Sequence, residues 1–129
     1  MHTEANVALV DRLARYDDLV EVGVGARPAV AAALAGRGRT VTATDVHERV
    51  VPDGVRFVRD DVTDPDPAVY READAVYALN CPPELQRPLS AVARAATADC
   101  LFTTLGTDPV VVDAVPETLP DGTLFETKA

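Results

Sequence analysis

The stretch LVEVGVGARPAVAAALAGRG, from Leu19 to Gly38, most constrains how this chain of 129 residues can fold. An apolar run of the length of a buried strand leads into two glycines one residue apart, and an alanine-rich helix pattern follows. Glycines at such a place let the backbone turn tightly and approach a nucleotide-like ligand closely. The stretch therefore predicts a strand, a loop and a helix that together can bind a nucleotide-like cofactor.

The rest of the chain continues the alternation of strands and helices. Apolar spacing predicts a first helix over Thr3–Tyr16, with Val7, Val10 and Leu13 on its buried face, and a later helix over Pro83–Thr97. Strands are predicted over TVTATDV, VRFVRDDV, DAVYALN and DCLFTTLG, and a short helix within DPDPAVYREA.

Strands that alternate with helices form a parallel sheet covered on both faces. The sequence thus predicts one α/β domain over residues 1–129, a three-layer Rossmann-like fold with a mostly parallel sheet. The proline-punctuated tail from Asp108 predicts a short C-terminal extension of one or two strands, with PDG as a turn. Such a tail is too short for a large substrate platform.

The chain is strongly acidic. Its 12 Lys and Arg residues against 21 Asp and Glu residues give a formal net charge of -9 at pH 7. Direct binding of nucleic acid is not expected, because phosphate binding needs a basic patch. This balance is typical of a halophilic intracellular protein, and an acidic protein from a GC-rich genome is the alternative.

No segment predicts export, membrane insertion or a metal site. The first residues lack the apolar core of a signal peptide, and no apolar run approaches the roughly 20 residues of a membrane span. Cys81 and Cys100 have no metal-ligand spacing, and His2 and His47 are isolated. We therefore expect a cytoplasmic protein without a bound metal.

Distinctive residues follow four of the predicted strands, where an open parallel sheet binds its ligands. They are Gly23 and Gly25 after the first strand, Asp45 after the second, Asp61 after the third and Asn80 after the fourth. Asp45 lies about 20 residues beyond Gly25, the spacing expected of a carboxylate that accepts hydrogen bonds from a ribose. The alternative is that the glycines only turn the chain and that the aspartates cap turns and helices.

Two cofactors compete for the glycine loop. NAD is bound by Gly-x-Gly-x-x-Gly, but Pro28 occupies the third position here, and Arg27 is the main argument for a phosphate. A methyltransferase-type site for S-adenosylmethionine carries an acidic residue two positions before the first glycine, as Glu21 does, and usually a further glycine where Arg27 stands.

Glu21 favours the second cofactor. A carboxylate inside an apolar strand costs several kcal/mol if it is buried unpaired, so it needs donors, a cation or a ligand amine. We therefore favour S-adenosylmethionine, with Glu21 near its amino group, Asp45 at its ribose and Asp61 near its adenine, and we keep NAD as the alternative. Full pairing of Glu21 with an arginine would remove this argument.

The segment ALNCPPEL, at the end of the fourth predicted strand, resembles the Asn/Asp-Pro-Pro-aromatic motif of amino-methyltransferases. The resemblance implies that Asn80 orients the acceptor amine. A cysteine separates Asn80 from the prolines, however, and Glu84 replaces the aromatic residue. A rigid exit from the strand is the alternative, and a nucleophilic role for Cys81 is not favoured because no basic partner is near it in sequence.

Nearly the whole chain resembles a family of small archaeal proteins known only as an uncharacterised protein family. The resemblance rests on VEVGVGARPAVAAALAGRG, VTATDV, VRFVRDDVTDPDPAVYREADAVYAL and PPELQRPL. It implies a Rossmann-like fold often likened to S-adenosylmethionine-dependent methyltransferases, and no established activity. DDVTDP and ADAVYAL are also similar to segments of nucleotide-binding regulatory domains of potassium transport systems, which keep the third glycine.

These observations favour a protein that binds a small molecule, an adenosine-containing cofactor, with S-adenosylmethionine before NAD. If it is an enzyme, it is a methyltransferase in which Asn80 orients a small acceptor, because methyl transfer is mainly a matter of in-line alignment. A homodimer or a protein partner would then complete the site. An NAD(H)-binding regulatory module and a ligand-free interaction domain are the alternatives from other classes.

Overall fold

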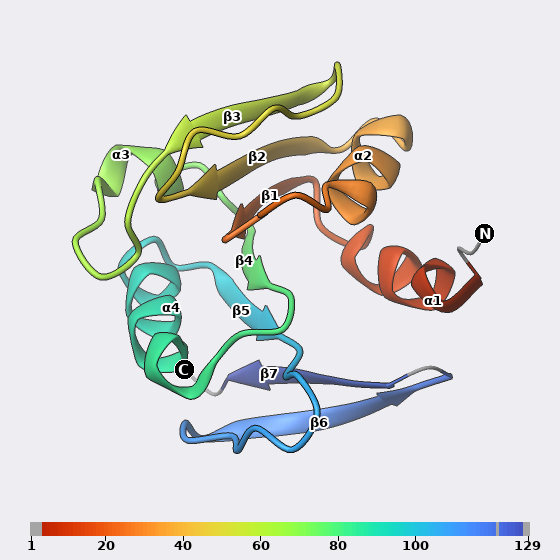
Figure 1. The fold of residues 1–129 in the computed structure, drawn as a ribbon, viewed down its shortest axis with the longest axis vertical. Coiled ribbons are helices and arrows are strands. Elements are labelled where there is room, and N and C mark those ends of the chain that lie inside the picture. The colour runs from red at the N-terminus through yellow and green to blue at the C-terminus, as the bar shows by residue number, and fades with distance from the viewer. Residues whose placement is uncertain (1–3, 121, 128–129) are drawn as a thin grey trace.

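The computed structural model describes residues 4–120 and 122–127. Its elements, in chain order, are α1 (Glu4–Leu13), β1 (Asp18–Val22), α2 (Ala29–Gly36), β2 (Thr40–Asp45), β3 (Val55–Arg59), α3 (Pro67–Tyr70), β4 (Ala75–Ala78), α4 (Pro83–Ala95), β5 (Asp99–Phe102), β6 (Ala114–Leu119) and β7 (Gly122–Thr127). Figure 1 shows one sheet with helices on both sides. Among the described residues, no helix is long and apolar enough to cross a membrane.

The sheet has seven strands in the order β3-β2-β1-β4-β5-β7-β6. Strands β1 to β5 pair in parallel, and β7 runs antiparallel to both β5 and β6. The predicted α/β class with a mostly parallel sheet is therefore confirmed. The strand order reverses at β1 and β4, so the switch point that binds ligands in such sheets lies at the carboxyl ends of these two strands.

The C-terminal strands are part of the sheet itself. The prediction of one or two strands in the tail is confirmed, since β7 lies between β5 and β6. A dinucleotide-binding sheet has the order 3-2-1-4-5-6, so the inserted antiparallel β7 sets this chain apart from that class. The short extension expected from the sequence is thus a two-stranded edge of the main sheet, paired with β5 at Leu101 and Phe102.

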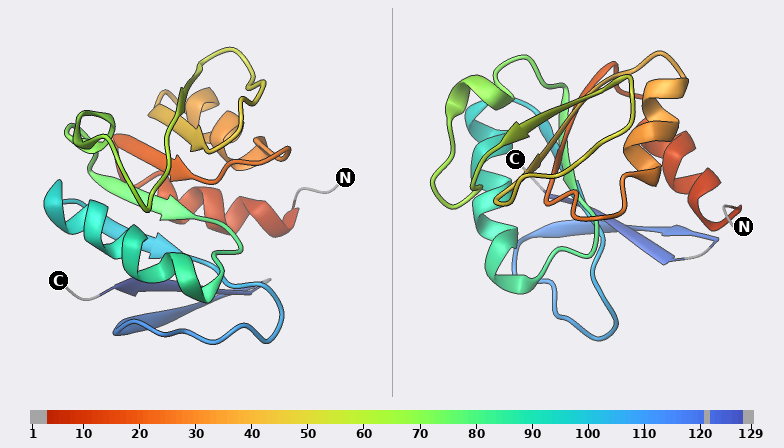
Figure 2. Two further views of the ribbon diagram at one scale, coloured as in Figure 1. Left: turned by 60° about the vertical axis from the view of Figure 1, so that its left-hand side comes forward. Right: turned by 45° about the horizontal axis from the view of Figure 1, so that its top comes forward.

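Each face of the sheet has its own apolar core. Helices α1 and α2 cover one face and α3 and α4 the other, as the views in Figures 1 and 2 show. Leu13, Leu19 and Leu34 lie in the first core, and Val76, Leu89 and Phe102 in the second, all at most 1% exposed. Because side chains alternate along a strand, Glu21 points to the same face as Leu19, toward α1 and α2.

Loops replace helices at two connections. Residues 46–54 join β2 to β3 without a helix, and residues 103–113 join β5 to β6 without one. The fully buried side chain of Gln86, on α4, holds the second loop: its Nε2 donates to the carbonyl of Pro109 at 3.0 Å, and its Oε1 accepts from the amide of Val111 at 2.7 Å. The loop therefore packs on α4 where a helix would otherwise lie.

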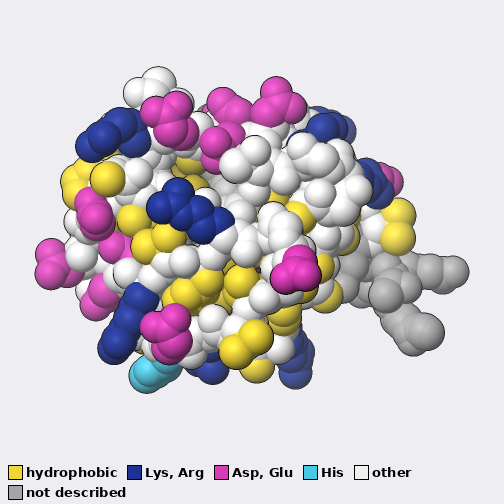
Figure 3. Space-filling view, turned by 90° about the horizontal axis from the view of Figure 1, so that it is seen from above, with side chains coloured by type: hydrophobic (Ala, Val, Ile, Leu, Met, Phe, Trp, Pro, Cys, Tyr) yellow, Lys and Arg dark blue, Asp and Glu magenta, His cyan; other side chains and the backbone are white. Residues whose placement is uncertain are grey.

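Charged side chains of both signs are spread over the face shown in Figure 3, with apolar side chains between them. Two exposed valines belong to the loop from β2 to β3, which runs alongside β3 at the top of Figure 1: Val46 is 47% exposed and Val50 is 96% exposed. The acidic side chains of this face lie in more than one group, mainly toward the top and the left of Figure 3.

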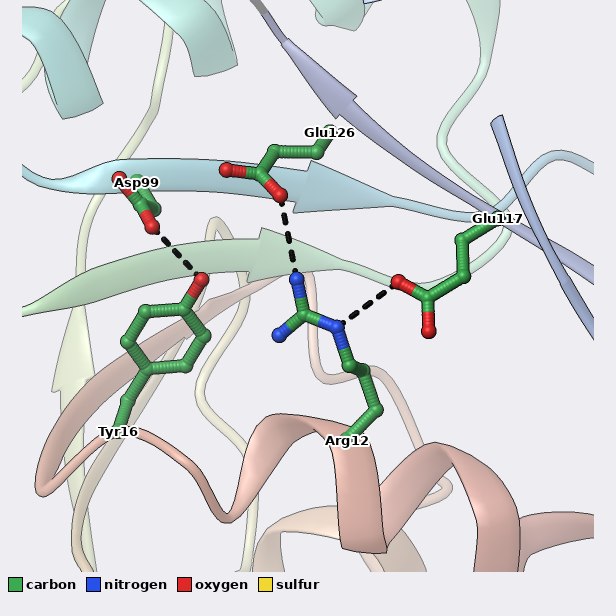
Figure 4. Close-up of polar contacts among 5 residues, drawn as sticks. All are labelled: Arg12, Tyr16, Asp99, Glu117 and Glu126. Atoms are coloured by element: carbon green, nitrogen blue, oxygen red, sulfur yellow. Dashed lines mark hydrogen bonds and ion pairs between the residues drawn. The ribbon is translucent and has the colours of Figure 1, made fainter. Parts of the chain in front are cut away.

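Helix α1 is fastened to the C-terminal hairpin by a buried arginine (Figure 4). The Nε of Arg12 donates to Glu117 on β6 at 2.9 Å, and its Nη2 donates to Glu126 on β7 at 3.1 Å. Arg12 is 8% exposed, whereas Val7, expected on the buried face, is 49% exposed. Each step of three residues turns the helix back by about 60°, so Val7 lies at the edge of the stripe centred on Leu13.

Candidate functional site

A cavity of about 850 Å³ lies at the carboxyl ends of the central parallel strands. Its walls come from the glycine loop and the start of α2, from the ends of β4 and β5, from α1 and from the adjoining ends of β6 and β7. They are Leu9, Glu21, Gly23–Val30, Leu79, Asn80, Thr103, Thr104, Leu119, Gly122 and Thr123. The position is the predicted switch point, and the volume falls within the roughly 300–1,000 Å³ of small-molecule sites.

The glycine loop is held in a conformation that requires its two glycines. Gly23 has a φ of 75° and Gly25 a φ of 59°, both in the left-handed region. A Cβ at either position would meet no atom within 4 Å, so the backbone angles rather than space favour glycine. The amides of Gly23 and Val24 both donate to the carbonyl of Thr44 at 2.9 Å, which turns the loop over the end of β2.

The start of α2 opens onto the cavity with unpaired helix amides. Pro28 is the residue that precedes the helix, and no side chain caps this end. The first intrahelical bond, from the amide of Ala32 to the carbonyl of Pro28, is 2.8 Å long, and Ala29 and Val30 line the cavity. Free amides and the positive end of the helix dipole favour an anionic group here, beside the exposed Arg27.

Glu21 is a buried carboxyl group in the cavity wall. It is 2% exposed, and its Oε1 accepts a hydrogen bond of 2.7 Å from the hydroxyl of Tyr77, its register partner on β4. Burial raises the pKa of Glu21 to about 7, although the Tyr77 hydrogen bond lowers it. The ion pairs of the described residues do not include Glu21, so the arginine pairing that would remove the ligand argument is not found there.

Asp45 holds the glycine loop from outside the cavity lining. Its Oδ2 accepts from the amide of Gly25 at 2.8 Å and its Oδ1 from the amide of His47 at 3.0 Å, while the Nε of Arg49 lies 3.5 Å from Oδ2. Burial alone would raise the pKa of Asp45, but the two amides and the Arg49 charge lower it below its usual value. Its predicted contact with a ribose stays a prediction.

Asp61 lies apart from the cavity. It is exposed, two residues beyond the end of β3, and its Oδ1 accepts from the amide of Thr63 at 2.9 Å and from the hydroxyl of Thr63 at 2.7 Å. These bonds lower the pKa of Asp61. They shape the loop after β3, and the predicted role near an adenine stays a prediction.

Asn80 lies in the cavity wall at the end of β4. Its φ of 54° is left-handed, a conformation that asparagine adopts more readily than most residues. The backbone amide of Asn80 donates to Oγ1 of Thr103 at 2.8 Å, and this bond joins the ends of β4 and β5. The structure thus brings Glu21, Gly23, Gly25 and Asn80 together around one cavity, while the acceptor-binding role of Asn80 stays a prediction.

Three parts of the cavity wall, and one residue behind it, were not identified from the sequence. The wall residues are the threonines after β5, Leu9 of α1 and the adjoining ends of β6 and β7, and the residue behind the wall is Tyr77, which donates to Glu21. A signal existed for Tyr77, because a tyrosine inside a buried strand usually needs a partner for its hydroxyl. The adjoining ends of β6 and β7 lie nearly a hundred residues from Glu21 in the sequence, and no local pattern links them to it.

The two cysteines are buried, and burial raises the pKa of both thiols. Both are 2% exposed, and burial raises the pKa of Cys81 to about 12 and that of Cys100 to about 11. A thiol of such pKa holds almost no thiolate near neutral pH, which argues against a nucleophilic Cys81. Within residues 4–120 and 122–127, no three His, Cys, Asp or Glu side chains come together to hold a metal.

A second, smaller cavity of about 300 Å³ lies on the opposite face of the sheet, between α3 and α4. Its lining is largely apolar and consists of Pro65, Pro67, Tyr70, Arg71, Val92, Ala95 and Ala96. None of the sequence-predicted site residues lies in it. The larger cavity is therefore the candidate site.

Sequence comparison places close relatives in archaea. The sequence profile described as Uncharacterised protein family (UPF0146) matches residues 3–128. A UPF0146 protein of Halobacterium salinarum is 61% identical over 114 residues, 88% of each chain. A UPF0146 protein of Archaeoglobus fulgidus is 50% identical over 84 residues, 65% of each chain.

Structural comparison finds methyltransferases of the same fold. An RNA methyltransferase from Salinibacter ruber, solved in complex with S-adenosyl-L-homocysteine, superposes with a TM-score of 0.65 at 18% identity, covering 92% of this chain and 88% of that chain. The S-adenosylmethionine-dependent methyltransferase SibL, in its apo form, gives 0.67 at 17% identity, covering 95% and 53%. At these identities the likeness shows a shared Rossmann-like fold.

Proposed function

The chain belongs to the uncharacterised protein family UPF0146, and we propose that it binds S-adenosylmethionine in the cavity beside its glycine loop. The observation that carries the proposal is the carboxyl group of Glu21, which lines the cavity, is 2% exposed and is hydrogen-bonded by the hydroxyl of Tyr77. A charged carboxylate in such a place is unfavourable unless a cation reaches it. S-adenosylmethionine carries both an ammonium and a sulfonium group.

The charges around the cavity suit the amino-acid part of this ligand. The free amides of α2 and the side chain of Arg27 provide a site for its carboxylate, and Glu21 provides one for its ammonium. The methyltransferase fold and the antiparallel β7 support the same ligand class. Asp45 supports the site by holding Gly25 in place through the hydrogen bond from the Gly25 amide. Neither Asp45 nor Asp61 lines the cavity, so the proposed contacts of Asp45 with the ribose and of Asp61 with the adenine require a ligand that extends beyond the lining residues.

Methyl transfer to a small acceptor is the activity that follows. S-adenosylmethionine, when bound, supplies an activated methyl group. Asn80 lies in the cavity wall beyond Glu21, where its side-chain amide would orient the acceptor in line with that group. A second subunit or a protein partner would close the open side of the cavity.

Calorimetric titration tests the proposal, in high salt, with S-adenosylmethionine, S-adenosylhomocysteine, NAD and NADH as ligands. We expect micromolar binding of the first two. The isosteric substitution Glu21→Gln keeps the acceptor for Tyr77 but removes the charge, and we expect it to weaken binding of S-adenosylmethionine by tenfold or more, about 1.4 kcal/mol. The exposed Glu72 provides the matched control, Glu72→Gln, which should bind as the wild type does.

Two outcomes would contradict the proposal. Binding of NAD or NADH alone would move the protein to the regulatory class. Failure of the folded protein to bind any of the four ligands would leave the glycine loop as a turn in an interaction domain.

A further inference from the structure

Two walls of the candidate cavity come from opposite ends of the chain. Leu9 belongs to α1, and Leu119, Gly122 and Thr123 belong to the β6–β7 hairpin. The ion pairs of Arg12 with Glu117 and Glu126 join these two elements (Figure 4). We propose that Arg12 is a positioning residue of the cavity, which fixes α1 relative to the hairpin in the arrangement that the ligand requires.

The faces of the two elements place the ion pair next to the cavity lining. Leu9 and Arg12 are three residues apart on α1, so they share one face of the helix. Glu117 and Leu119 are two residues apart on β6, so they share one face of the strand. The Arg12–Glu117 ion pair is therefore adjacent to Leu9 along α1 and to Leu119 along β6, the two leucines of the cavity wall.

The burial of Arg12 and its two partners indicates that the ion pairs orient α1 rather than stabilise the fold. The Arg12 side chain is 9% exposed, whereas those of Glu117 and Glu126 are 40% and 41% exposed. Burying the guanidinium of Arg12 costs its hydration, and this cost offsets much of what the ion pairs gain. An apolar side chain at the same position would not have that cost, so the ion pairs are weak evidence for a role in stability. The planar guanidinium of Arg12 instead binds carboxylates on two different strands, and this fixes α1 in more than one direction.

A neighbouring contact extends the same attachment to β5. The hydroxyl of Tyr16, just after α1, donates to Asp99 at 2.7 Å, and the guanidinium of Arg12 lies 5.7 Å from the centre of the Tyr16 ring. Figure 4 shows Arg12 reaching from α1 toward both glutamates, with Tyr16 beside it. The end of α1 is thus tied by polar groups to β5, β6 and β7, which carry the far wall of the cavity.

The chain also offers a matched control. Asp11, next to Arg12 on α1, forms an ion pair of 2.6 Å with Arg37 at the end of α2. The side chain of Asp11 is 58% exposed and that of Arg37 is 43% exposed, and this ion pair does not involve the hairpin. Arg37→Met therefore removes an ion pair from α1 without affecting the link between the two cavity walls.

The test combines amide hydrogen exchange of the free protein with calorimetric binding of S-adenosylhomocysteine, and in this second part it rests on the proposed function. In Arg12→Met we expect exchange to increase in α1 and in β6–β7 together, with β1 to β4 unchanged. We expect its affinity for S-adenosylhomocysteine to fall by about tenfold, a typical coupling between sites. Arg12→Lys, which keeps the charge but not the fork, should lie between Arg12→Met and the wild type, and Arg37→Met should change neither quantity.

The outcomes separate this proposal from the proposed function. Wild-type affinity in Arg12→Met would overturn the positioning role, even with faster exchange. If Arg12→Met does not fold, Glu117→Gln, which leaves Arg12 paired with Glu126, should still weaken binding by a smaller factor, and unchanged binding in that variant would overturn the role. If the wild type binds no S-adenosylhomocysteine, the proposed function fails, and the hydrogen exchange of Arg12→Met alone tests the link between the two walls. Faster exchange in both α1 and the hairpin would support the link, and faster exchange in only one of them, or in neither, would overturn it.

Discussion

At the scale of single residues, the most unusual feature of the cavity is the buried carboxyl group of Glu21 and its hydrogen bond from Tyr77. The two side chains are register partners on adjacent central strands, and both are at most 2% exposed. The hydroxyl gives the carboxyl group one hydrogen bond, which is too little to replace the water that a carboxylate loses on burial. A protein that only needed a stable strand would gain by placing an apolar residue at this position.

This burial makes the stability of the protein depend on pH. The pKa of Glu21 rises from 4.5 in the unfolded chain to about 7 in the fold. The folded state therefore binds the proton more tightly, and the stabilisation is complete below pH 4.5 and is lost as the pH rises through about 7. We expect Glu21→Gln to gain at most about 3 kcal/mol over the wild type between pH 5 and pH 8.

Urea unfolding at both pH values measures this difference. Glu72→Gln, an exposed substitution of the same kind, controls for the loss of one negative charge. Parallel pH profiles for Glu21→Gln and the wild type would show that Glu21 is not a destabilised carboxyl group.

The sequence showed which residues were unusual, but not what each one contacts. Glu21, Gly23, Gly25 and Asn80 were recognised because a charge or a turn residue interrupts an apolar pattern, and all four line the cavity. Asp45 was recognised by its spacing, yet its oxygens are bound by the loop amides of Gly25 and His47. Which donor reaches a carboxylate depends on the tertiary path of the loop, and spacing carries no information about that path.

At the scale of elements, the connection from β5 to β6 shows how a loop can take the place of a helix. Residues 103–113 have no side chain pattern of a helix, and Gln86 supplies the hydrogen bonds that a helix would make internally. Val110 and Val112 pack on the core beneath it. The predicted strand DCLFTTLG extends as far as Gly106, whereas β5 ends at Phe102, so the start of this loop was not predicted. The inward position of Gln86 was not predicted either, since a glutamine on a helix is usually exposed.

Replacement of Gln86 should destabilise the fold more than any change on the outer face of α4. Gln86→Ala leaves the carbonyl of Pro109 and the amide of Val111 without this partner and opens a buried space. We expect a loss of about 2–3 kcal/mol in the free energy of unfolding. The adjacent Arg87→Ala, which removes an exposed hydrogen bond to Val111, should cost under about 1 kcal/mol. Equal losses for the two variants, measured by urea unfolding, would contradict this account of the loop.

At the scale of the whole molecule, the strand order could not be derived from the sequence. Local patterns predicted each strand of the parallel part, because buried strands are apolar and are bounded by turn residues. The insertion of β7 between β5 and β6 depends on contacts such as the stacking of Phe102 on Phe125, with ring centres 5.5 Å apart. Such contacts join distant segments, and no local pattern reveals them. The same hairpin contributes Leu119, Gly122 and Thr123 to the cavity wall.

The formal net charge of -9 predicts that salt stabilises the whole protein. Like charges at the surface repel in the compact state, and dissolved ions screen that repulsion over distances of about 10 Å or less. We expect the midpoint of thermal unfolding to rise steadily with KCl concentration. Sorbitol at equal osmolality is the control without ions. A midpoint that stays constant or falls with KCl, relative to sorbitol, would argue against salt adaptation.

The most direct test of the central claim is an NMR titration of the isotope-labelled protein with S-adenosylhomocysteine. We expect amide shifts to change at the ends of β1, β4 and β5, at Glu21 and in residues 23–30, 79–80 and 103–104, and at Leu119, Gly122 and Thr123 of the hairpin. The amide shifts around the smaller cavity between α3 and α4, near Tyr70 and Val92, should stay unchanged. Changes centred on the smaller cavity, or none at saturating ligand, would contradict the assignment of the larger cavity as an S-adenosylmethionine site.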